Sequence, residues 1–539
     1  MTNFHRSLVL GCSALALASC GADEIISPGS GGVDVVINNP APSPTPTPTP
    51  TSSLVTPAGS CPTIADPSGL TDDGTITGPT GTWRVCTLPS RIMVSTTLPR
   101  IAGLLYRLNG RVDVGCDGGF TVPTAAAPHA STTVGCPTLT ADTNVMLTIE
   151  PGSILYGGTG QSWMAVNRGN RINATGTPAR PIVFTSVDNV AGFNTDNSIG
   201  QWGGVVLLGR AQITDCDFGS VASRTCERET EGAVNPARFG GNDDAYNAGT
   251  MNYVQIRYSG FVLSNNRELQ ALTTEGIGSG TNLAYIQSHN SSDDSVEFFG
   301  GNFNLQYFIA TGADDDSLDV DTGARVNMQY ALLIQRPGQG DALFEIDSNG
   351  RETDTPRTRL RVSNFLALQP QTSSNSEAND RASALFRGNA DVTLYNGAII
   401  TPNNECIRIT SNTDAANRAT LTARSVVLQC AATRYLGDGS GTAPYTAAEV
   451  ATAFGAGSNN NADNFVNTLT MTFINGANES GVVTTDPSVL DTFFQAAPTP
   501  FQIAAAWPGN DTWFVGWTCN SSYADFGSAS SACTSLPVI

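Results

Sequence analysis

Segments that recur at 22-residue spacing constrain the fold of this chain more than any other feature. Two acidic segments share this offset, residues 293–297 (DDSVE) and 315–319 (DDSLD). A second element shows the same offset between residues 282–286 (NLAYI) and 304–308 (NLQYF), and it returns at residues 327–331 (NMQYA). A period of 20–50 residues indicates a stacked repeat architecture, in which equivalent side chains line up in space.

The segments around these repeats favour strands joined by corners. Residues 145–156, 173–184 and 202–210 each combine short runs of β-forming residues with Gly, Asn or Asp. No amphipathic helical pattern separates them, which argues against a doubly wound or α/β-barrel fold. We therefore predict an all-β chain, a right-handed parallel β-helix (β-solenoid) with disulfide-stapled caps and a small mixed C-terminal region.

Composition restricts the class of ligand. The chain carries 47 acidic and 27 basic residues, a formal charge of −20, and it contains no Lys. Such an acidic surface repels nucleic acid and attracts divalent cations. We expect no nucleic-acid partner.

The N-terminus indicates the compartment. An apolar run at residues 8–17 follows Arg6 and is too short to span a bilayer. It ends in Leu-Ala-Ser before Cys20, which resembles the lipobox of bacterial lipoproteins. The resemblance implies that Cys20 is lipidated and anchors the protein to a membrane. In such lipoproteins an Asp directly after the Cys favours retention in the inner membrane, and here residues 21–22 are Gly and Ala. The resemblance therefore implies an outer-membrane lipoprotein that faces the periplasm or the cell surface. The alternative is an ordinary secretory signal with a coincidental Cys.

Apart from Cys12 and Cys20, the chain has ten cysteines. They suit local disulfides in an oxidising compartment, because their number is even and they fall into neighbouring pairs. No CxxC motif supports a zinc or redox site. The expected pairs are Cys61–Cys86, Cys116–Cys136, Cys216–Cys226, Cys406–Cys430 and Cys519–Cys533.

Composition shifts divide the chain into five parts. They are a lipoprotein signal peptide (1–19), a Gly/Pro/Thr-rich tether (20–58), an N-terminal disulfide-containing cap (59–140), the parallel β-helix (141–430) and a C-terminal cap region (431–539). The last part has helical spacing at 445–454 and 487–497, and three tryptophans (Trp507, Trp513, Trp517) that either pack or form a carbohydrate-stacking surface.

Side-chain alternation predicts where the acidic residues point. Glu297 points to the other side of its strand from Val296 and Phe298. If the coils stack in register, the outward carboxylates of adjacent coils lie about 4.8 Å apart. Like charges at that distance destabilise a sheet, and calcium, with six to eight oxygen ligands, relieves the repulsion. The alternative is a solvated acidic face without metal. Asp294 and Asp316 share the parity of the inward residues, so we expect them to cap corner amides. The calcium candidates are Asp293, Glu297, Asp315, Asp319 and Asp321, with Glu345 and Asp347 second.

Several strings resemble a family of bacterial surface lipoproteins with a right-handed parallel β-helix and no assigned function. They are residues 149–152 (IEPG), 181–186 (PIVFTS), 201–209 (QWGGVVLLG), 275–281 (EGIGSGT) and 513–517 (WFVGW). The resemblance implies the fold, and it implies no reaction or catalytic residue.

We therefore expect a non-catalytic, calcium-stabilised surface lipoprotein with a binding or structural role and a polysaccharide or surface protein as partner. One alternative is a carbohydrate-active enzyme, a polysaccharide lyase or glycoside hydrolase, that uses the acidic coils with Arg325, Arg336 or Arg387 as base. Another is an adhesin or surface-assembly subunit. His289, at the corner before residue 293, is either a proton carrier or metal ligand or a structural histidine. No His–Asp partners are evident for Ser295 or Ser317.

Overall fold

The computed structural model describes residues 54–233, 235–264, 267–348, 350–372, 382–496 and 513–538. The predicted signal peptide, Cys20, most of the tether and Trp507 lie outside the described residues. Those that are described belong to the second of two structural units, residues 54–539.

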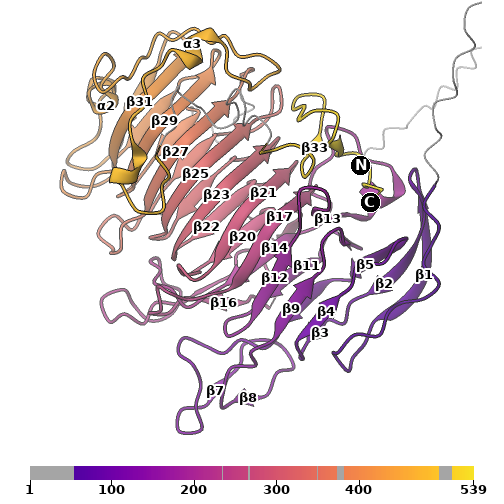
Figure 1. Ribbon diagram of the computed structural model, residues 1–539. Helices are drawn as coiled ribbons and strands as arrows, with labels where there is room; N and C mark the ends of the chain where they lie inside the picture. The colour runs from indigo at the N-terminus through magenta and orange to yellow at the C-terminus, as the bar shows by residue number, and fades with distance from the viewer. Residues whose placement is uncertain are drawn as a thin grey trace, which may run out of the picture. The chain divides into compact units, whose positions relative to one another are not determined.

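Two large sheets, of 15 and 11 strands among the described residues, wind together as a parallel β-helix (Figure 1). Every strand pair within them is parallel except β1–β2. The longer one, sheet A, runs in the order β1 (Thr71–Gly78), β2 (Gly81–Thr87), β5 (Leu104–Leu108), β10 (Ile154–Gly157), β13 (Ile182–Ser186), β17 (Gly249–Arg257), β21 (Asn282–His289), β23 (Asn302–Thr311), β25 (Arg325–Ile334), β27 (Arg359–Leu368), β29 (Asp391–Thr401) and β31 (Thr420–Cys430), with β4 (Thr96–Leu98), β9 (Met146–Ile149) and β12 (Arg171–Thr175) joined through β17.

Sheet B supplies one short strand to each coil. Its order is β3 (Arg91–Ile92), β6 (Arg111–Val114), β11 (Trp163–Val166), β14 (Gly204–Leu208), β20 (Leu272–Glu275), β22 (Val296–Phe299), β24 (Asp319–Asp321), β26 (Phe344–Ile346), β28 (Ala384–Phe386), β30 (Ile407–Thr410) and β32 (Tyr435–Asp438).

Smaller elements decorate the coils. They are the pairs β7 (His129–Ala130) with β8 (Thr138–Leu139), β15 (Arg228–Glu229) with β16 (Arg238–Phe239), β18 (Val262–Ser264) with β19 (Arg267–Glu268), and β33 (Cys519–Asn520) with β34 (Ser531–Ala532), and the helices α1 (Val187–Ala191), α2 (Ala447–Phe454), α3 (Ala477–Ser480) and η1 (Pro487–Val489). Of the predicted helix at 487–497, only the η1 turn forms, after its N-cap Asp486.

The sequence repeat is the coil itself. Leu283 pairs with Leu305, and Leu305 pairs with Met328, so the repeated elements occupy equivalent positions on β21, β23 and β25. These side chains point into one continuous apolar core between the sheets, where they are almost completely buried. Burying that inner face on neighbouring coils is the main contribution to stability, because a single coil cannot cover its own apolar side.

A ladder of left-handed residues bends each long strand of sheet A. Tyr253, Tyr285, Tyr307 and Tyr330 have φ between 52 and 66°, and the strand pairing skips all four of them. Their rings stack on one another with centroids 4.2, 4.2 and 4.9 Å apart. Later coils place Asn364, Asn396 and Ser425 at the same bend. Stacking offsets part of the backbone strain at Tyr, whereas Asn tolerates this conformation.

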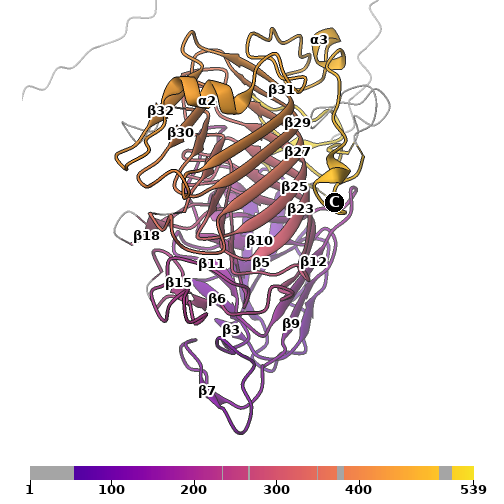
Figure 2. The same cartoon turned by 90° about the vertical axis from the view of Figure 1, so that its left-hand side faces the viewer.

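The β-helix extends further in both directions than the predicted range of 141–430. Parallel pairing already begins where β2 meets β5, and it continues to β32 beyond residue 430. Helix α2 covers the last coil, where Val450 and Phe454 enter the core (Figure 2). Its capping box between Thr446 and Glu449 explains why the helix starts there.

The C-terminal region does more than cap the last coil. Residues 513–538 form a strap that returns along the outer face of sheet A, and β33 reaches the early strands (Figure 1). Gln287 exchanges two hydrogen bonds with the backbone of Cys519, at 3.0 and 2.7 Å. Buried Arg257 donates to the carbonyls of Cys533 and Ser535, both at 2.9 Å. Trp513 and Trp517 pack against the tyrosine ladder, which favours the packing interpretation of these two tryptophans.

The ten cysteines form the five pairs expected from their sequence neighbours. They are Cys61–Cys86, Cys116–Cys136, Cys216–Cys226, Cys406–Cys430 and Cys519–Cys533.

Candidate cation-binding site on the acidic coils

Strand register stacks carboxylates from successive coils on the outer face of sheet B. Glu297 pairs with Asp319, and Asp319 pairs with Glu345. The alternate positions, Phe298 and Val320, are fully buried in the core. The alternation expected from the sequence therefore holds, and the acidic side chains of adjacent strands lie about one strand spacing apart, ~4.8 Å.

The turns that lead into β22, β24 and β26 add a second row of acids. In this row the amide of Asp316 donates to the carboxylate of Asp294 (2.9 Å), and the amide of Ala342 donates to Asp316 (2.6 Å). Asp294 and Asp316 thus bond backbone amides of the following coil, the role that the sequence suggested for them. Each of these bonds uses one lone pair of a carboxylate, and a carboxylate has further lone pairs with which it can bind a ligand.

Three overlapping groups of these acids could each hold a metal ion. Within every group the carboxylate oxygens lie within 4.8 Å of one another. The groups are Asp293 with Asp294 and Asp315, Asp294 with Glu297 and Asp319, and Asp315 with Asp316 and Asp341. Asp294 belongs to two groups and Asp315 to two, so the sites form one continuous acidic cluster.

Burial and mutual repulsion disfavour the ionised acids. Burial, followed by the charge of Asp315, raises the pKa of Asp293 well above its usual range. Burial and the charge of Asp319 do the same to the pKa of Glu297. The pKa of Asp319 is raised by burial and by Asp321. Such shifts favour the uptake of protons or of a cation by the cluster.

Nearby bases do not neutralise the centre of the cluster. Among the described residues, no ion pair engages Asp293, Asp294, Glu297 or Asp319. In addition, Oδ1 of Asp319 is buried without a hydrogen-bond donor. The hydroxyls of Ser295 and Ser317, from the same two segments, are also buried without partners among the described atoms. Buried polar atoms of this kind can be satisfied by a water molecule or by an ion at the site.

Two acids that the repeat could not reveal approach the cluster from other parts of the chain. Glu268, in β19, interacts with Asp293, and burial together with the charge of Asp315 raises its pKa. Glu231, in the insertion between β14 and β17, adds its negative charge to Asp293 and Glu297. Asp341, in the turn before β26, was likewise not predicted, because it lies outside the repeated motif.

Three of the predicted ligands lie beside the converging groups without belonging to them. Glu345 and Asp347 both pair with Arg387 from the next coil. Asp321 accepts a hydrogen bond from the amide of Thr322, and burial raises its pKa to about 6. None of the three belongs to a group of converging acids among the described residues. Of the predicted ligands, the structure therefore brings Asp293, Glu297, Asp315 and Asp319 into such groups and leaves Asp321, Glu345 and Asp347 outside them.

The remaining candidates for chemistry lie apart from the cluster. His289 ends β21, where it is fully buried; its Nδ1 contacts the hydroxyl of Thr311 at 2.9 Å, and its ring lies near Tyr258. Burial lowers its pKa well below the usual value. Arg325 and Arg336 are committed to Asp244 and Asp314. A histidine kept neutral by its surroundings fits the structural interpretation better than a proton carrier.

Fold and site together define a parallel β-helix protein with an acidic outer face. Residues 133–471, more than half of the chain, match the family of the pectate-lyase like beta helix domain, and the protein belongs to this family. No curated protein and no solved structure matches the chain. None of the described helices has the length and apolar character needed to cross a lipid bilayer.

Proposed function

We propose that the acidic cluster binds calcium, and that the cation-stabilised β-helix has a non-catalytic binding or structural role at the bacterial cell surface. One observation carries the proposal: Asp294, Glu297 and Asp319 converge within 4.8 Å, while an oxygen of Asp319 is buried without a donor. A divalent cation would satisfy that oxygen and offset the repulsion at the same time.

Calcium suits this donor set better than other metals. The converging groups offer only oxygen ligands, and calcium takes six to eight oxygens in flexible geometry. Zinc and copper prefer imidazole or thiolate, and the two cysteines nearest to His289 are joined in a disulfide. The lipobox-like Cys20 and the five disulfides support the proposed outer-membrane or periplasmic location.

Calorimetry and thermal unfolding test the proposal on the full chain. Purified protein freed of metal with EDTA should bind calcium and melt at a higher temperature in its presence. The gain in stability is about 2.7 kcal/mol when calcium is at a hundred times its Kd. Asp319→Asn should remove most of the effect. Asp391→Asn, an outward acid on β29 paired with Arg357, is the matched control and should keep it. No heat of binding and identical melts would refute the proposal.

A carbohydrate-active enzyme is the second candidate. Its support is the family name together with Arg387, which lies on the same face as the acids and contacts Glu345 and Asp347. Carboxyls with a raised pKa on adjacent strands also suit a general acid. A polysaccharide panel assayed with calcium separates the two candidates. Turnover that disappears in Arg387→Ala would favour the enzyme, and no turnover on any polysaccharide would remove it.

A further inference from the structure

A polar cavity lies at the corners where successive coils pass from sheet B into sheet A. Its volume is about 220 Å³. The lining residues lie in the segments that lead from β6 to β9, from β11 to β12 and from β14 to β17, with Arg171 at the start of β12, so several coils build the cavity together. None of the acids in the cluster on β22 and β24 lines this cavity.

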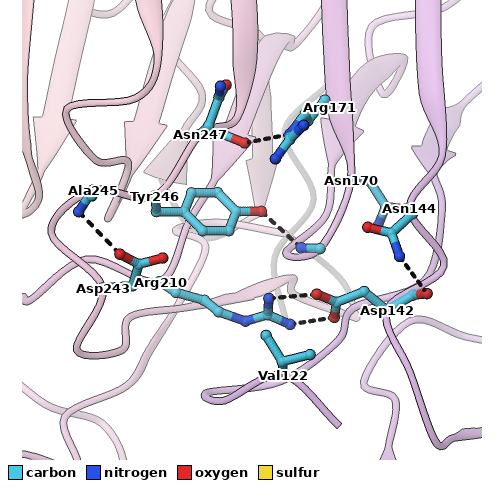
Figure 3. Close-up of a pocket in the computed structure, with 11 residues that line it drawn as sticks. Val122, Asp142, Asn144, Asn170, Arg171, Arg210, Asp243, Ala245, Tyr246 and Asn247 are labelled. Carbon is cyan, nitrogen blue, oxygen red and sulfur yellow. Dashed lines mark hydrogen bonds and ion pairs between the residues drawn. The ribbon is translucent and has the colours of Figure 1, made fainter.

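The floor of the cavity is buried and held in place. Arg210 is 4% exposed and makes two contacts with the carboxylate of Asp142, at 2.8 and 2.5 Å. Tyr246 is 7% exposed, and its hydroxyl accepts a hydrogen bond from the amide of Gly169 at 2.7 Å. Figure 3 shows the Tyr246 side chain between Arg210 and Arg171. These contacts preorganise the site, which lowers the cost of ordering it when a ligand binds.

The rim of the cavity carries polar groups that still have hydrogen-bonding capacity beyond their contacts within the protein. Exposed Arg171 donates through Nε to the carbonyl of Asn247 (3.2 Å), and it forms no ion pair with a described residue. The amide oxygen of Asn247 accepts from Gly249, which leaves its NH₂ group available. Asp243 accepts from the amide of Ala245 through one oxygen and can accept again through the other. The hydroxyl of Tyr246 still has a proton to donate.

This set of groups matches the chemistry of a neutral sugar. The lining contains two guanidinium groups (Arg171, Arg210) and two carboxylates (Asp142, Asp243), so its formal charge is balanced. Sugar hydroxyls both donate and accept, and the rim offers donors and acceptors side by side. The volume is below the roughly 300–1,000 Å³ of pockets for drug-sized ligands, which suits a single ring. We propose that the cavity binds one neutral hexose unit, a role independent of the acidic cluster.

The surface next to the cavity suits a longer glycan. Thr148, Asn173 and Thr250 pair in register on β9, β12 and β17, half-exposed, while their neighbour Ile172 points into the core. Successive side chains of this row lie ~4.8 Å apart, which is the distance between adjacent strands. Sugar units that extend past Arg171 can form hydrogen bonds with this row. We therefore expect the hexose in the cavity to be the terminal unit of a glycan rather than a free monosaccharide.

Calorimetric titration of the full chain with neutral hexoses, their linear oligosaccharides and hexuronates tests the inference. We expect neutral sugars to bind, and oligosaccharides to bind more tightly than monosaccharides. Arg171→Ala removes a charged donor from the rim and should weaken binding roughly tenfold or more. Arg424→Ala changes another exposed arginine on the outer face of sheet A and should leave binding unchanged.

Several results would overturn the inference. One is the absence of binding by every neutral sugar in the panel, and another is binding of hexuronates alone. Equal weakening by Arg171→Ala and Arg424→Ala would also contradict it. Loss of sugar binding in Asp319→Asn, with Arg171→Ala unaffected, would place the sugar on the acidic coils instead. Tyr246→Phe, which keeps the ring, provides a second variant: it should weaken binding while the melting temperature shows that the fold is retained.

Discussion

Glu297 and Asp319 lie directly opposite each other on the parallel strands β22 and β24, and neither forms an ion pair with a described residue. Phe298 and Val320 beside them hold the register by packing in the core. The two carboxylates cannot move apart without breaking that packing. Their repulsion is therefore a permanent property of the coil, and a proton or a cation has to compensate for it.

Removing one charge from this pair should make the metal-free protein more stable. We expect Asp319→Asn to raise the free energy of unfolding in EDTA at neutral pH by about 1 kcal/mol, because it relieves like-charge repulsion. The same variant should gain less from calcium than the wild type. Urea unfolding with and without calcium measures both effects. A variant that is less stable than the wild type in EDTA would contradict the expectation.

Stability should fall as the pH rises through the pKa of Glu275. This side chain is fully buried on β20, accepts a hydrogen bond from Thr230 (2.7 Å), and burial raises its pKa to about 8. In the unfolded chain the carboxyl has its ordinary pKa of 4.5. The folded state therefore holds a proton that the unfolded state releases, so this contribution is complete below 4.5 and is lost as the pH approaches and passes 8.

Glu275→Gln tests this pH dependence, because Gln keeps an acceptor for Thr230 and does not ionise. Urea unfolding in excess calcium, between about pH 6 and pH 9, should give a flatter stability profile for the variant than for the wild type. The variant should also be the more stable of the two near pH 9. Parallel profiles would show that Glu275 does not control the slope.

Substitutions in the tyrosine ladder should destabilise the protein to different degrees, depending on whether the new side chain tolerates the left-handed backbone. Tyr285 has φ of 52° and stacks between Tyr253 and Tyr307. Tyr285→Val combines lost stacking with a β-branched residue in the left-handed region and should cost about 2–4 kcal/mol. Tyr285→Asn should cost less, because Asn364 and Asn396 occupy the same bend in later coils. Equal losses in urea unfolding would argue against backbone strain as the cause.

The disulfide between Cys519 and Cys533 should control the attachment of the C-terminal strap. Replacing both residues by Ala opens a loop with a sequence separation of 14, for which the expected loss is about 3 kcal/mol. Hydrogen exchange should then accelerate in residues 513–538. Replacing Cys216 and Cys226 is the matched control and should leave exchange in the strap unchanged. Fast exchange of the strap in both variants would point to general destabilisation.

Part of the site could be predicted from the repeat. Glu297 and Asp319 are equivalent residues of two coils, and strand alternation puts both on the outer face. Glu231 and Glu268 could not be predicted, because the insertions that bring them to the cluster carry no repeat. The pairing of Arg387 with Glu345 and Asp347 was missed for a related reason, because Arg387 follows Glu345 by 42 residues and lies beyond the repeated motif.

The stacked β-fold, the neighbouring disulfide pairs and the row of outward acids could all be predicted from the sequence. These follow from local properties, namely residue period, alternation along a strand and the spacing of cysteines. Three features became known from the folded molecule alone: which acids converge, the strap over sheet A, and the cavity beside Arg171. Those features depend on how segments far apart in the chain pack together, and packing is set by the shapes of all partners at once rather than by any one segment.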